Sequence, residues 1–339
     1  ILKMGLNCDL RVLKPEAYGA GLVHFTGSKE HNIALRSYCI KKGMKLDEYG
    51  LFQAKTNKLI ACKTEEEVYG KLGMQFVPPE MRENTGEIEL ALQKKLPEPV
   101  GYEDIQGDLH THTNWSDGAN STEEMVKKAI ALGYEYYAIT DHSKSDIVAN
   151  GLNEKRVKEH FKEIDKLQKE YPEIHLLKGA EVAILNTGKL DYGNELLKEM
   201  DIVIGSIHSG FKTPEKEMTK RLLSALGNEY LTFLAHPTGR LINQRNPYEY
   251  DLEKVLETCT ANNVAVEVNA FPSRMDFDAE HIRLALQKKV KLVINTDAHS
   301  TQNLDFMEFG IAQARRGWAK KENVLNTLPW KSLEKQMQK

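Results

Sequence analysis

The sequence is poor in cysteine, and its four cysteines, Cys8, Cys39, Cys62 and Cys259, are scattered without a Cys-x-x-Cys pair. This pattern argues against a disulfide framework and a thiolate metal site, and it favours a reducing, cytoplasmic location. No apolar run approaches the roughly 18 residues that a membrane span needs. The opening stretch, ILKMGLNCDLRVL, has neither an initiator methionine nor the features of a signal peptide, so we expect a fragment of a longer protein.

The sequence also has little net charge, but the charge is unevenly distributed. Residues 1–63 hold 11 Lys/Arg and 5 Asp/Glu, whereas the whole chain has a net charge of −3. A basic amino-terminal part joined to an acidic remainder suits a phosphate-rich partner and bound cations, although ordinary variation in charge explains this pattern equally well.

The first part of the chain has a mixed α and β pattern. CDLRVL, at 8–13, alternates like a strand, and residues 30–43 have a helical pattern that ends at Gly43. Two stretches rich in proline and charge, 77–86 and 95–104, indicate a linker between domains. The predicted division is a first domain at 1–92, a linker at 93–103 and a second domain at 104–339.

From residue 104 onward, short β-rich runs alternate with helical stretches. The predicted strands are 104–112, 134–142, 174–181, 201–208, 230–237, 264–270 and 290–299. The predicted helices are 121–133, 153–169, 191–200, 214–227, 249–262, 278–289 and 303–316. Such strand–helix units predict parallel strands covered by helices, so the fold class is α/β. A doubly wound sheet fits as well, but we favour a barrel of about seven units.

Side chains that bind metals recur where these predicted strands end. They are His110, His112, His142, Glu181, His208, His236, Asp297 and His299, together with Asp117 in the loop after the first strand. In an α/β barrel the carboxyl ends of the strands form one face, so we expect these side chains to converge. The other five histidines show no such placement, and we interpret them as structural or surface residues.

Nine converging ligands are too many for one ion, because zinc takes about four. Three ions that share one bridging carboxylate account for the number. Imidazole and carboxylate ligands suit Zn, Mn or Fe. Closely spaced metal ions are a common solution for phosphoester hydrolysis, in which a metal-activated hydroxide attacks phosphorus and no serine or cysteine nucleophile is needed.

These motifs resemble those of the polymerase and histidinol phosphatase (PHP) domain. The resemblance covers about residues 104–325 and rests on HTH, TDH, GAE, SIH, AHP and TDAH, with all nine ligand positions filled. It implies a distorted (β/α)7 barrel and up to three divalent ions, Mn²⁺ and/or Zn²⁺. The implied grouping is His110, His112, Glu181 and Asp297 for one ion; Glu181, His208 and His236 for a second; and Asp117, His142 and His299 for a third.

The first 92 residues resemble the end of the palm and the thumb of X-family DNA polymerases, whose bacterial and archaeal members carry a carboxyl-terminal PHP domain. The resemblance implies that Asp9 matches a catalytic palm carboxylate and that Gly27 and Ser28 form the turn beside the nucleotide. Asn32 and Arg36 match positions that approach the nucleotide and the template. A Gly-Ser turn that opens a helix also offers backbone N–H groups to phosphate.

A polymerase site needs two earlier palm carboxylates to hold its Mg²⁺ ions, and this chain starts after them. We therefore expect Asp9 to be a remnant and this chain not to synthesise DNA. The resemblance instead implies a Mn²⁺-stimulated 3′-5′ exonuclease for DNA repair, with action on gaps, abasic sites or 3′-phosphates as further expectations. Candidate phosphate-binding residues in the strand-end loops are Lys144, Arg240, Arg245 and Arg274, and Trp115 is a candidate to stack a base or to form a wall of the site.

Three alternatives stay open at this point. A small-molecule phosphatase, such as one for histidinol phosphate, shares the barrel and metals but needs no thumb. An amidohydrolase barrel also opens with His-x-His, but Asp117 and the DAH ending at 297–299 argue against it. An inactive scaffold is disfavoured by the complete ligand set.

Overall fold

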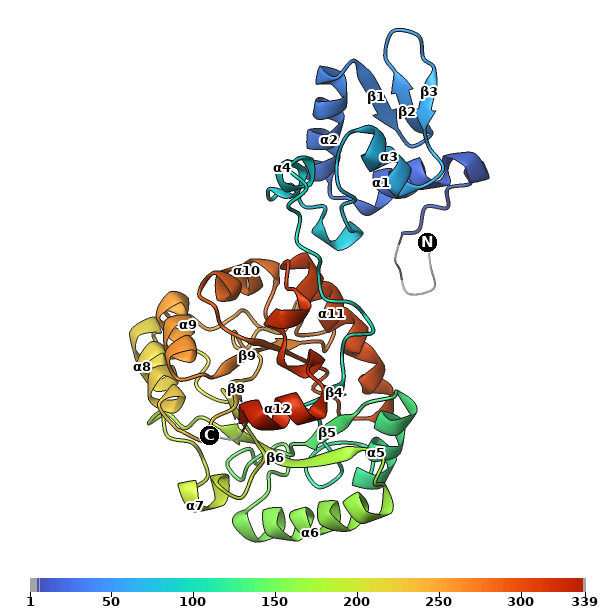
Figure 1. Cartoon of the computed structure of the whole chain (residues 1–339). Coiled ribbons are helices and arrows are strands. Elements are labelled where there is room, and N and C mark those ends of the chain that lie inside the picture. The colour runs from blue at the N-terminus through green and yellow to red at the C-terminus, as the bar shows by residue number, and fades with distance from the viewer. Residues whose placement is uncertain (1–4, 6, 338–339) are drawn as a thin grey trace. The chain divides into compact units, whose positions relative to one another are not determined.

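A computed structural model describes residues 5 and 7–337 of the chain. The chain divides between Pro97 and Glu98 into two compact units (Figure 1).

The first unit combines short helices with a small antiparallel sheet. Its helices are α1 (Tyr18–Thr26), α2 (Lys29–Lys41), α3 (Glu65–Lys71) and α4 (Glu87–Leu92), with 3-10 turns at Pro15–Ala17 and Pro79–Met81. Its strands are β1 (Met44–Asp47), β2 (Gly50–Gln53) and β3 (Leu59–Ala61), paired in that order. The side chain of Ser28 accepts a hydrogen bond from the His31 amide, which explains why α2 begins where it does.

Polar groups are buried in the core of this unit. His31 Nδ1 lies 2.6 Å from Glu87 Oε1, and its Nε2 lies 3.0 Å from the Tyr69 hydroxyl. Arg82 is fully buried and donates to Glu65 and to the Val77 carbonyl. The proline-rich stretch 77–86, which suggested a linker, therefore packs within the first unit.

The strand predicted at 8–13 is absent. This segment has no regular structure, and Leu10 and Val12 are 87% and 88% exposed. Alternating residues form a strand only beside a partner strand, and the described part of the chain provides none here. The predicted helix at 30–43 is confirmed as α2, although it buries Leu35 and Cys39 and leaves Ile33 exposed.

The second unit is a parallel barrel, as predicted. Its strands are β4 (Gly107–Asp108), β5 (Tyr136–Ile139), β6 (His175–Ala183), β7 (Ile202–Ser206), β8 (Phe233–Leu234), β9 (Ala265–Asn269) and β10 (Leu292–Asn295). They pair in sequence order from β4 to β10, and every pair is parallel. A doubly wound sheet reverses its strand order, so this alternative is excluded.

The two outer strands, β4 and β10, are joined by single bridges instead of a ladder. Thr111 and Ala298 form an isolated parallel bridge, and the His112 amide donates to the Ala298 carbonyl at 2.8 Å. At the other end, the buried side-chain Nδ2 of Asn326 donates to the carbonyls of Gly107 and Ile294. These links nearly close the barrel and account for its distorted form.

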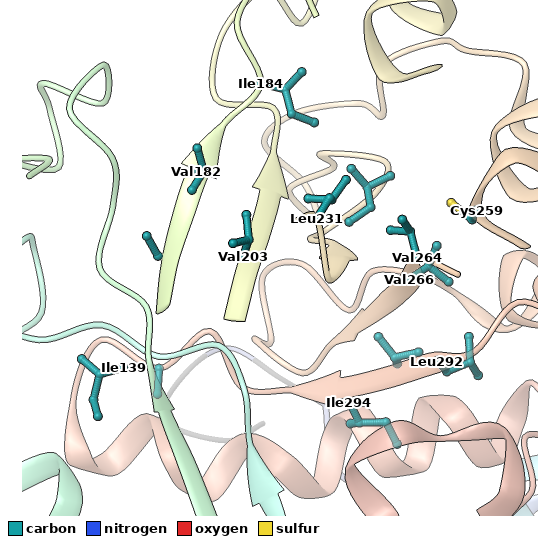
Figure 2. Packing of buried hydrophobic residues seen from close by; sticks show 14 of the residues in the cluster. Ile139, Val182, Ile184, Val203, Leu231, Cys259, Val264, Val266, Leu292 and Ile294 are labelled. Carbon is teal, nitrogen blue, oxygen red and sulfur yellow. The ribbon is translucent and has the colours of Figure 1, made fainter. Parts of the chain in front are cut away.

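Helices cover the outside of the barrel (Figure 1). They are α5 (Thr122–Ala131), α6 (Glu154–Glu170), α7 (Asn194–Leu197), α8 (Glu215–Leu226), α9 (Leu252–Ala261), α10 (Ala279–Gln287), α11 (Met307–Arg316) and α12 (Trp330–Met337), with 3-10 turns at Thr301–Phe306, Lys321–Asn323 and Leu325–Thr327. In the core between strands and helices, Val182, Val203 and Val266 come from β6, β7 and β9 (Figure 2). No helix in the described residues is long and apolar enough to cross a membrane.

Helix α12 blocks the amino-terminal end of the barrel. Leu333 is 1% exposed and joins the inner cluster with Tyr136, Phe233 and Ala265. The Trp330 amide donates to Glu135, which directly precedes β5. Access to the barrel interior is therefore left to the carboxyl ends of the strands.

Candidate metal centre

The nine predicted ligand residues all lie at the carboxyl-terminal end of the barrel. His110 and His112 follow β4, His142 follows β5, Glu181 lies in β6, His208 follows β7, His236 follows β8, Asp297 and His299 follow β10, and Asp117 lies in the loop after β4. Most of them are buried, and the side chains of Asp117, His299 and His208 are the most exposed at 34%, 30% and 17%. The parallel topology therefore brings together residues that are far apart in the sequence.

The backbone is unusual at two of these positions. His236 has φ 29° and Asp297 has φ 54°, in the left-handed region that side-chain-bearing residues rarely adopt. Such conformations cost on the order of 1–3 kcal/mol and cluster at functional sites. In both cases the turn directs a side chain across the end of the barrel.

The potential ligand atoms gather into overlapping groups. Within each group, the atoms lie within 4.8 Å of one another. The groups are His110, His112 and Asp297; Glu181, His208 and His236; His112, Asp117, His142 and His299; and His142, Asp146 and His208. The group of Glu181, His208 and His236 has the expected members. The group of His110, His112 and Asp297 lacks the expected Glu181, the group around Asp117 also includes His112, and the fourth group adds Asp146.

Glu181 lies at the centre of these groups. Its Oε1 is 3.0 Å from His208 Nε2 and 2.8 Å from His236 Nε2. Its Oε2 is 2.9 Å from His142 Nδ1 and 3.4 Å from His110 Nε2. The two oxygens of this buried carboxylate therefore face different groups, as a bridging ligand must.

Two ring nitrogens fit metal ligation particularly well. The Nε2 atoms of His110 and His112 are buried and have no hydrogen-bond partner. Buried polar atoms are nearly always paired, and an unpaired one calls for an explanation such as an ion. Imidazole nitrogens beside carboxylates suit Zn²⁺ or Mn²⁺, so the residues fit the divalent ions that the sequence implied.

A carboxylate that sequence reasoning missed supports this set. Glu267, in the middle of β9, is fully buried, and its Oε1 lies 2.7 Å from His110 Nδ1. Its Oε2 accepts hydrogen bonds from the His236 amide at 2.7 Å and from the Asn269 side chain, and its Oε1 also accepts one from the Asn295 side chain. A glutamate inside the apolar run VAVEVNA was the available signal.

Two further aspartates that sequence reasoning missed hold the ligand loops. Asp141 accepts hydrogen bonds from Thr113 and Ser116, in the loop that carries Asp117. Asp108 accepts from the His110 amide and from Thr296. The signal in the sequence was their position: Asp141 directly precedes His142, and Asp108 lies two residues before His110.

Asp146 is the fourth carboxylate that sequence reasoning missed. It follows β5, and its Oδ2 lies 2.8 Å from His208 Nδ1 and 3.7 Å from His142 Nδ1. The His208 ring is therefore held between Asp146 and Glu181.

Burial and neighbouring charges shift the pKa values of the group around His112. Burial, with His299 and His142 nearby, lowers the pKa of His112 to about 4, which keeps this imidazole neutral. Burial alone raises the pKa of Asp117, but the hydrogen bond from His299 and the nearby histidines outweigh this effect and lower it to about 2. A neutral imidazole and an ionised carboxylate are the forms that bind a metal.

The four predicted cationic residues have different environments. Arg274 Nε lies 3.0 Å from Asp297 Oδ2, at the centre itself. Lys144 pairs with Glu154. Arg240 donates to the Arg274 carbonyl and to Asp278, whereas Arg245 donates to the Gly239 carbonyl and lies 3.7 Å over the Phe211 ring. Of the four, Arg274 is the one in contact with a predicted ligand.

Trp115 packs against its own domain. Its ring stacks on His160 at 4.7 Å between centroids, and its Nε1 donates to Glu163 at 2.8 Å. These contacts are typical of a residue that forms a wall of the site.

The predicted thumb residues lie together at the start of α2. The side-chain Nδ2 of Asn32 donates to the carbonyls of His24, Gly27 and Ser28, which fixes the turn at 27–28. Arg36 lies 2.6 Å from His24 Nδ1. Asp9 lies apart from them in sequence, in the exposed segment that precedes α1.

A parallel barrel with clustered imidazoles and carboxylates at its carboxyl end is typical of metal-dependent enzymes. Comparison with known families agrees: residues 21–83 match the DNA polymerase beta thumb and residues 108–271 match the PHP domain.

Two curated relatives match this chain over different shares of its length. The DNA polymerase/3'-5' exonuclease PolX of Bacillus subtilis is 44% identical over 328 residues, which cover 97% of this chain and 57% of that protein. The chain therefore spans little more than half the length of this relative. A "probable phosphatase" of Acetivibrio thermocellus is 32% identical over 57% of this chain and 78% of its own length.

Among solved structures, a putative histidinol phosphatase from Listeria monocytogenes covers 58% of this chain and 97% of its own, with 18% identity and a TM-score of 0.48. Taken together, the family models and the curated relatives show that the chain belongs to the PHP family of metal-dependent phosphoesterases and carries a thumb of the DNA polymerase beta type.

Proposed function

We propose that this chain hydrolyses phosphodiester bonds at the 3′ ends of DNA strands, as a metal-dependent 3′-5′ exonuclease. The observation that carries the proposal is the position of Glu181, whose two oxygens face separate groups of buried histidines. The name of the Bacillus relative, which includes 3'-5' exonuclease, supports the choice of reaction.

The nine residues would hold up to three divalent ions, Mn²⁺ and/or Zn²⁺. His110, His112, Glu181 and Asp297 would hold one; Glu181, His208 and His236 a second; and Asp117, His142 and His299 a third. When bound, such ions lower the pKa of a water molecule and offset the charge of phosphoryl oxygens.

Residues around the predicted ligands would orient the histidine rings and bind a phosphoryl oxygen of the substrate. Glu267 and Asp146 orient His110 and His208 through their Nδ1 atoms. Arg274 binds Asp297 through Nε, so the rest of its guanidinium is available to a phosphoryl oxygen. We assign Arg274 this role ahead of Lys144, Arg240 and Arg245, whose charged groups make contacts elsewhere.

The first unit would bind DNA. It contains the thumb match and all of residues 1–63, which carry an excess of basic residues. The turn at Gly27 and Ser28 precedes α2, and with Asn32 and Arg36 it would contact the phosphate backbone. Gapped and abasic DNA are substrates to test, and synthesis of DNA, which would require Mg²⁺ and further carboxylates beside Asp9, is not part of the proposal for this chain.

The second candidate function is hydrolysis of a small phosphate monoester. One observation favours it: the "probable phosphatase" of Acetivibrio thermocellus aligns with 57% of this chain over 78% of its own length. Parallel assays with a DNA oligonucleotide and with histidinol phosphate, at equal enzyme and Mn²⁺ concentration, separate the two. We expect turnover of the oligonucleotide, and release of phosphate from histidinol phosphate with intact DNA would favour the phosphatase.

A further inference from the structure

Two apolar side chains are exposed beside the candidate centre. Ile147 is 86% exposed and Val148 is 99% exposed, at the tip of a turn formed by residues 143–151 directly after β5. We call this segment the 143–151 turn. Single exposed apolar residues are ordinary, but two adjacent β-branched ones at the mouth of a polar site indicate a contact with something apolar.

Backbone hydrogen bonds hold the turn in one shape. The Gly151 amide donates to the Asp146 carbonyl at 2.9 Å, and the Asn150 amide donates to the Ile147 carbonyl at 3.1 Å. A side chain at Gly151 would place its Cβ 2.0 Å from the Ser143 carbonyl oxygen, so the chain can cross here only with glycine. The backbone of the 143–151 turn therefore holds Ile147 and Val148 in a fixed position.

The turn is attached to the centre at two places. The Asp146 carboxylate, one residue before Ile147, lies 2.8 Å from His208 Nδ1. The Asn150 side chain donates to the carbonyls of Trp115 and Ser116, immediately before Asp117. The residues on the two sides of the apolar tip are thus attached at or next to the predicted ligands His208 and Asp117.

These two ligands are also among the accessible ones. The side chains of Asp117, His299 and His208 are 34%, 30% and 17% exposed, whereas those of His110, Glu181 and Asp297 are 4% exposed or less. A phosphodiester therefore approaches the centre from the side on which the turn lies. The turn offers no free cation for the backbone, because Lys144 is paired with Glu154.

We propose that Ile147 and Val148 form an apolar wedge that separates the 3′-terminal base from its neighbour and its complement as the strand enters the centre. The inference rests on the proposed exonuclease function. Apolar side chains inserted at a base step unstack it, and a buried centre requires the last nucleotide of a paired end to leave the duplex. Single-stranded ends are already free of a complement and depend less on the wedge.

The test compares a blunt duplex with the same strand unpaired, in Mn²⁺, using the whole chain. In the double variant Ile147→Ser, Val148→Ser, we expect the ratio of duplex to single-strand cleavage rates to fall about ten-fold or more. The variant Ile147→Leu, Val148→Leu keeps an apolar tip and should restore the ratio. Leu132→Ser, an exposed apolar position at the far end of α5, is the matched control and should leave the ratio unchanged.

A second readout does not require cleavage. The probe is a duplex with 2-aminopurine as its 3′-terminal base and a phosphorothioate as its terminal linkage, which resists cleavage. Its fluorescence should increase when it binds the unmodified protein and increase less when it binds the serine variant. An unchanged rate ratio with unchanged fluorescence would overturn the wedge. Hydrolysis of bis(p-nitrophenyl) phosphate, which has no bases, reports separately on the proposed function: its absence in the unmodified protein would count against the exonuclease itself.

Discussion

The Nδ1 atom of His110 lies 2.7 Å from Oε1 of Glu267, and both side chains are fully buried. This contact fixes the imidazole so that its Nε2 faces Glu181 and Asp297, at 3.4 Å and 3.6 Å. Carboxylates behind histidine ligands set both the tautomer and the basicity of the ring. Glu267 is therefore a positioning residue for the centre.

Replacing Glu267 with glutamine tests this role. Glu267→Gln should weaken metal binding and lower phosphodiesterase activity by about 10–100-fold, because the amide orients the His110 ring less firmly. Metal titration followed by calorimetry measures the affinity. Glu195→Gln, in an exposed position on α7, serves as the control. Unaltered metal affinity in a folded Glu267→Gln protein would contradict the assignment.

Removal of Glu181 should be more damaging. In Glu181→Ala, two groups of histidines lose the carboxylate that they share. We expect a loss of activity beyond the roughly 10–100-fold of an outer partner, and a loss of more than one bound ion per chain. Elemental analysis of the purified variant measures the ions, and full occupancy would speak against a bridging ligand.

Arg274 should act on substrate binding. Because its Nε lies 3.0 Å from Asp297 and a guanidinium has further donors, Arg274→Met should raise the KM for bis(p-nitrophenyl) phosphate by about ten-fold. Lys144→Met removes a charge already paired with Glu154 and provides the comparison. Equal effects of the two changes would show that Arg274 has no special role.

The stability of the first unit should depend on pH through Glu87. Burial raises the pKa of this carboxyl, but hydrogen bonds from His31 and from the Thr85 and Asn84 amides outweigh burial and hold the pKa below its ordinary value of 4.5. A lowered folded-state pKa gives stabilisation that is complete above the unfolded pKa and lost as pH falls through the folded pKa.

The measurement compares the unmodified protein with Glu87→Gln. Hydrogen exchange of backbone amides in α3 and α4 gives the unfolding free energy of each protein as a function of pH. The difference in unfolding free energy between the two proteins should be full near neutral pH and shrink as pH falls below 4.5. A difference that stays constant through the acid range would rule out the ionised carboxylate as its source.

The sequence predicted the barrel because each strand–helix unit has its own local pattern. All seven strands of the barrel appear where the β-rich runs predicted them. The convergence of His110 and His236 followed from parallel topology alone, without knowledge of side-chain positions.

Other features depend on tertiary contacts that no local pattern specifies. Glu267 looked like one polar residue in an apolar strand until the fold placed it behind His110. Leu10 and Val12 alternate correctly for a strand, but the described residues offer no partner for one. In the sequence, Lys144 and Arg245 were equally good candidates to bind a phosphate. Only the structure shows that Lys144 forms an ion pair with Glu154 and that the Arg245 guanidinium lies over the Phe211 ring.

The most direct test of the proposed function is cleavage of a DNA strand labelled at its 5′ end, with Mn²⁺. We predict stepwise shortening from the 3′ end, abolished by a chelator and in His110→Ala, with fold retention checked by circular dichroism. Undiminished shortening by His110→Ala, or no shortening by the unmodified protein in any divalent metal, would contradict a metal-dependent 3′-5′ exonuclease.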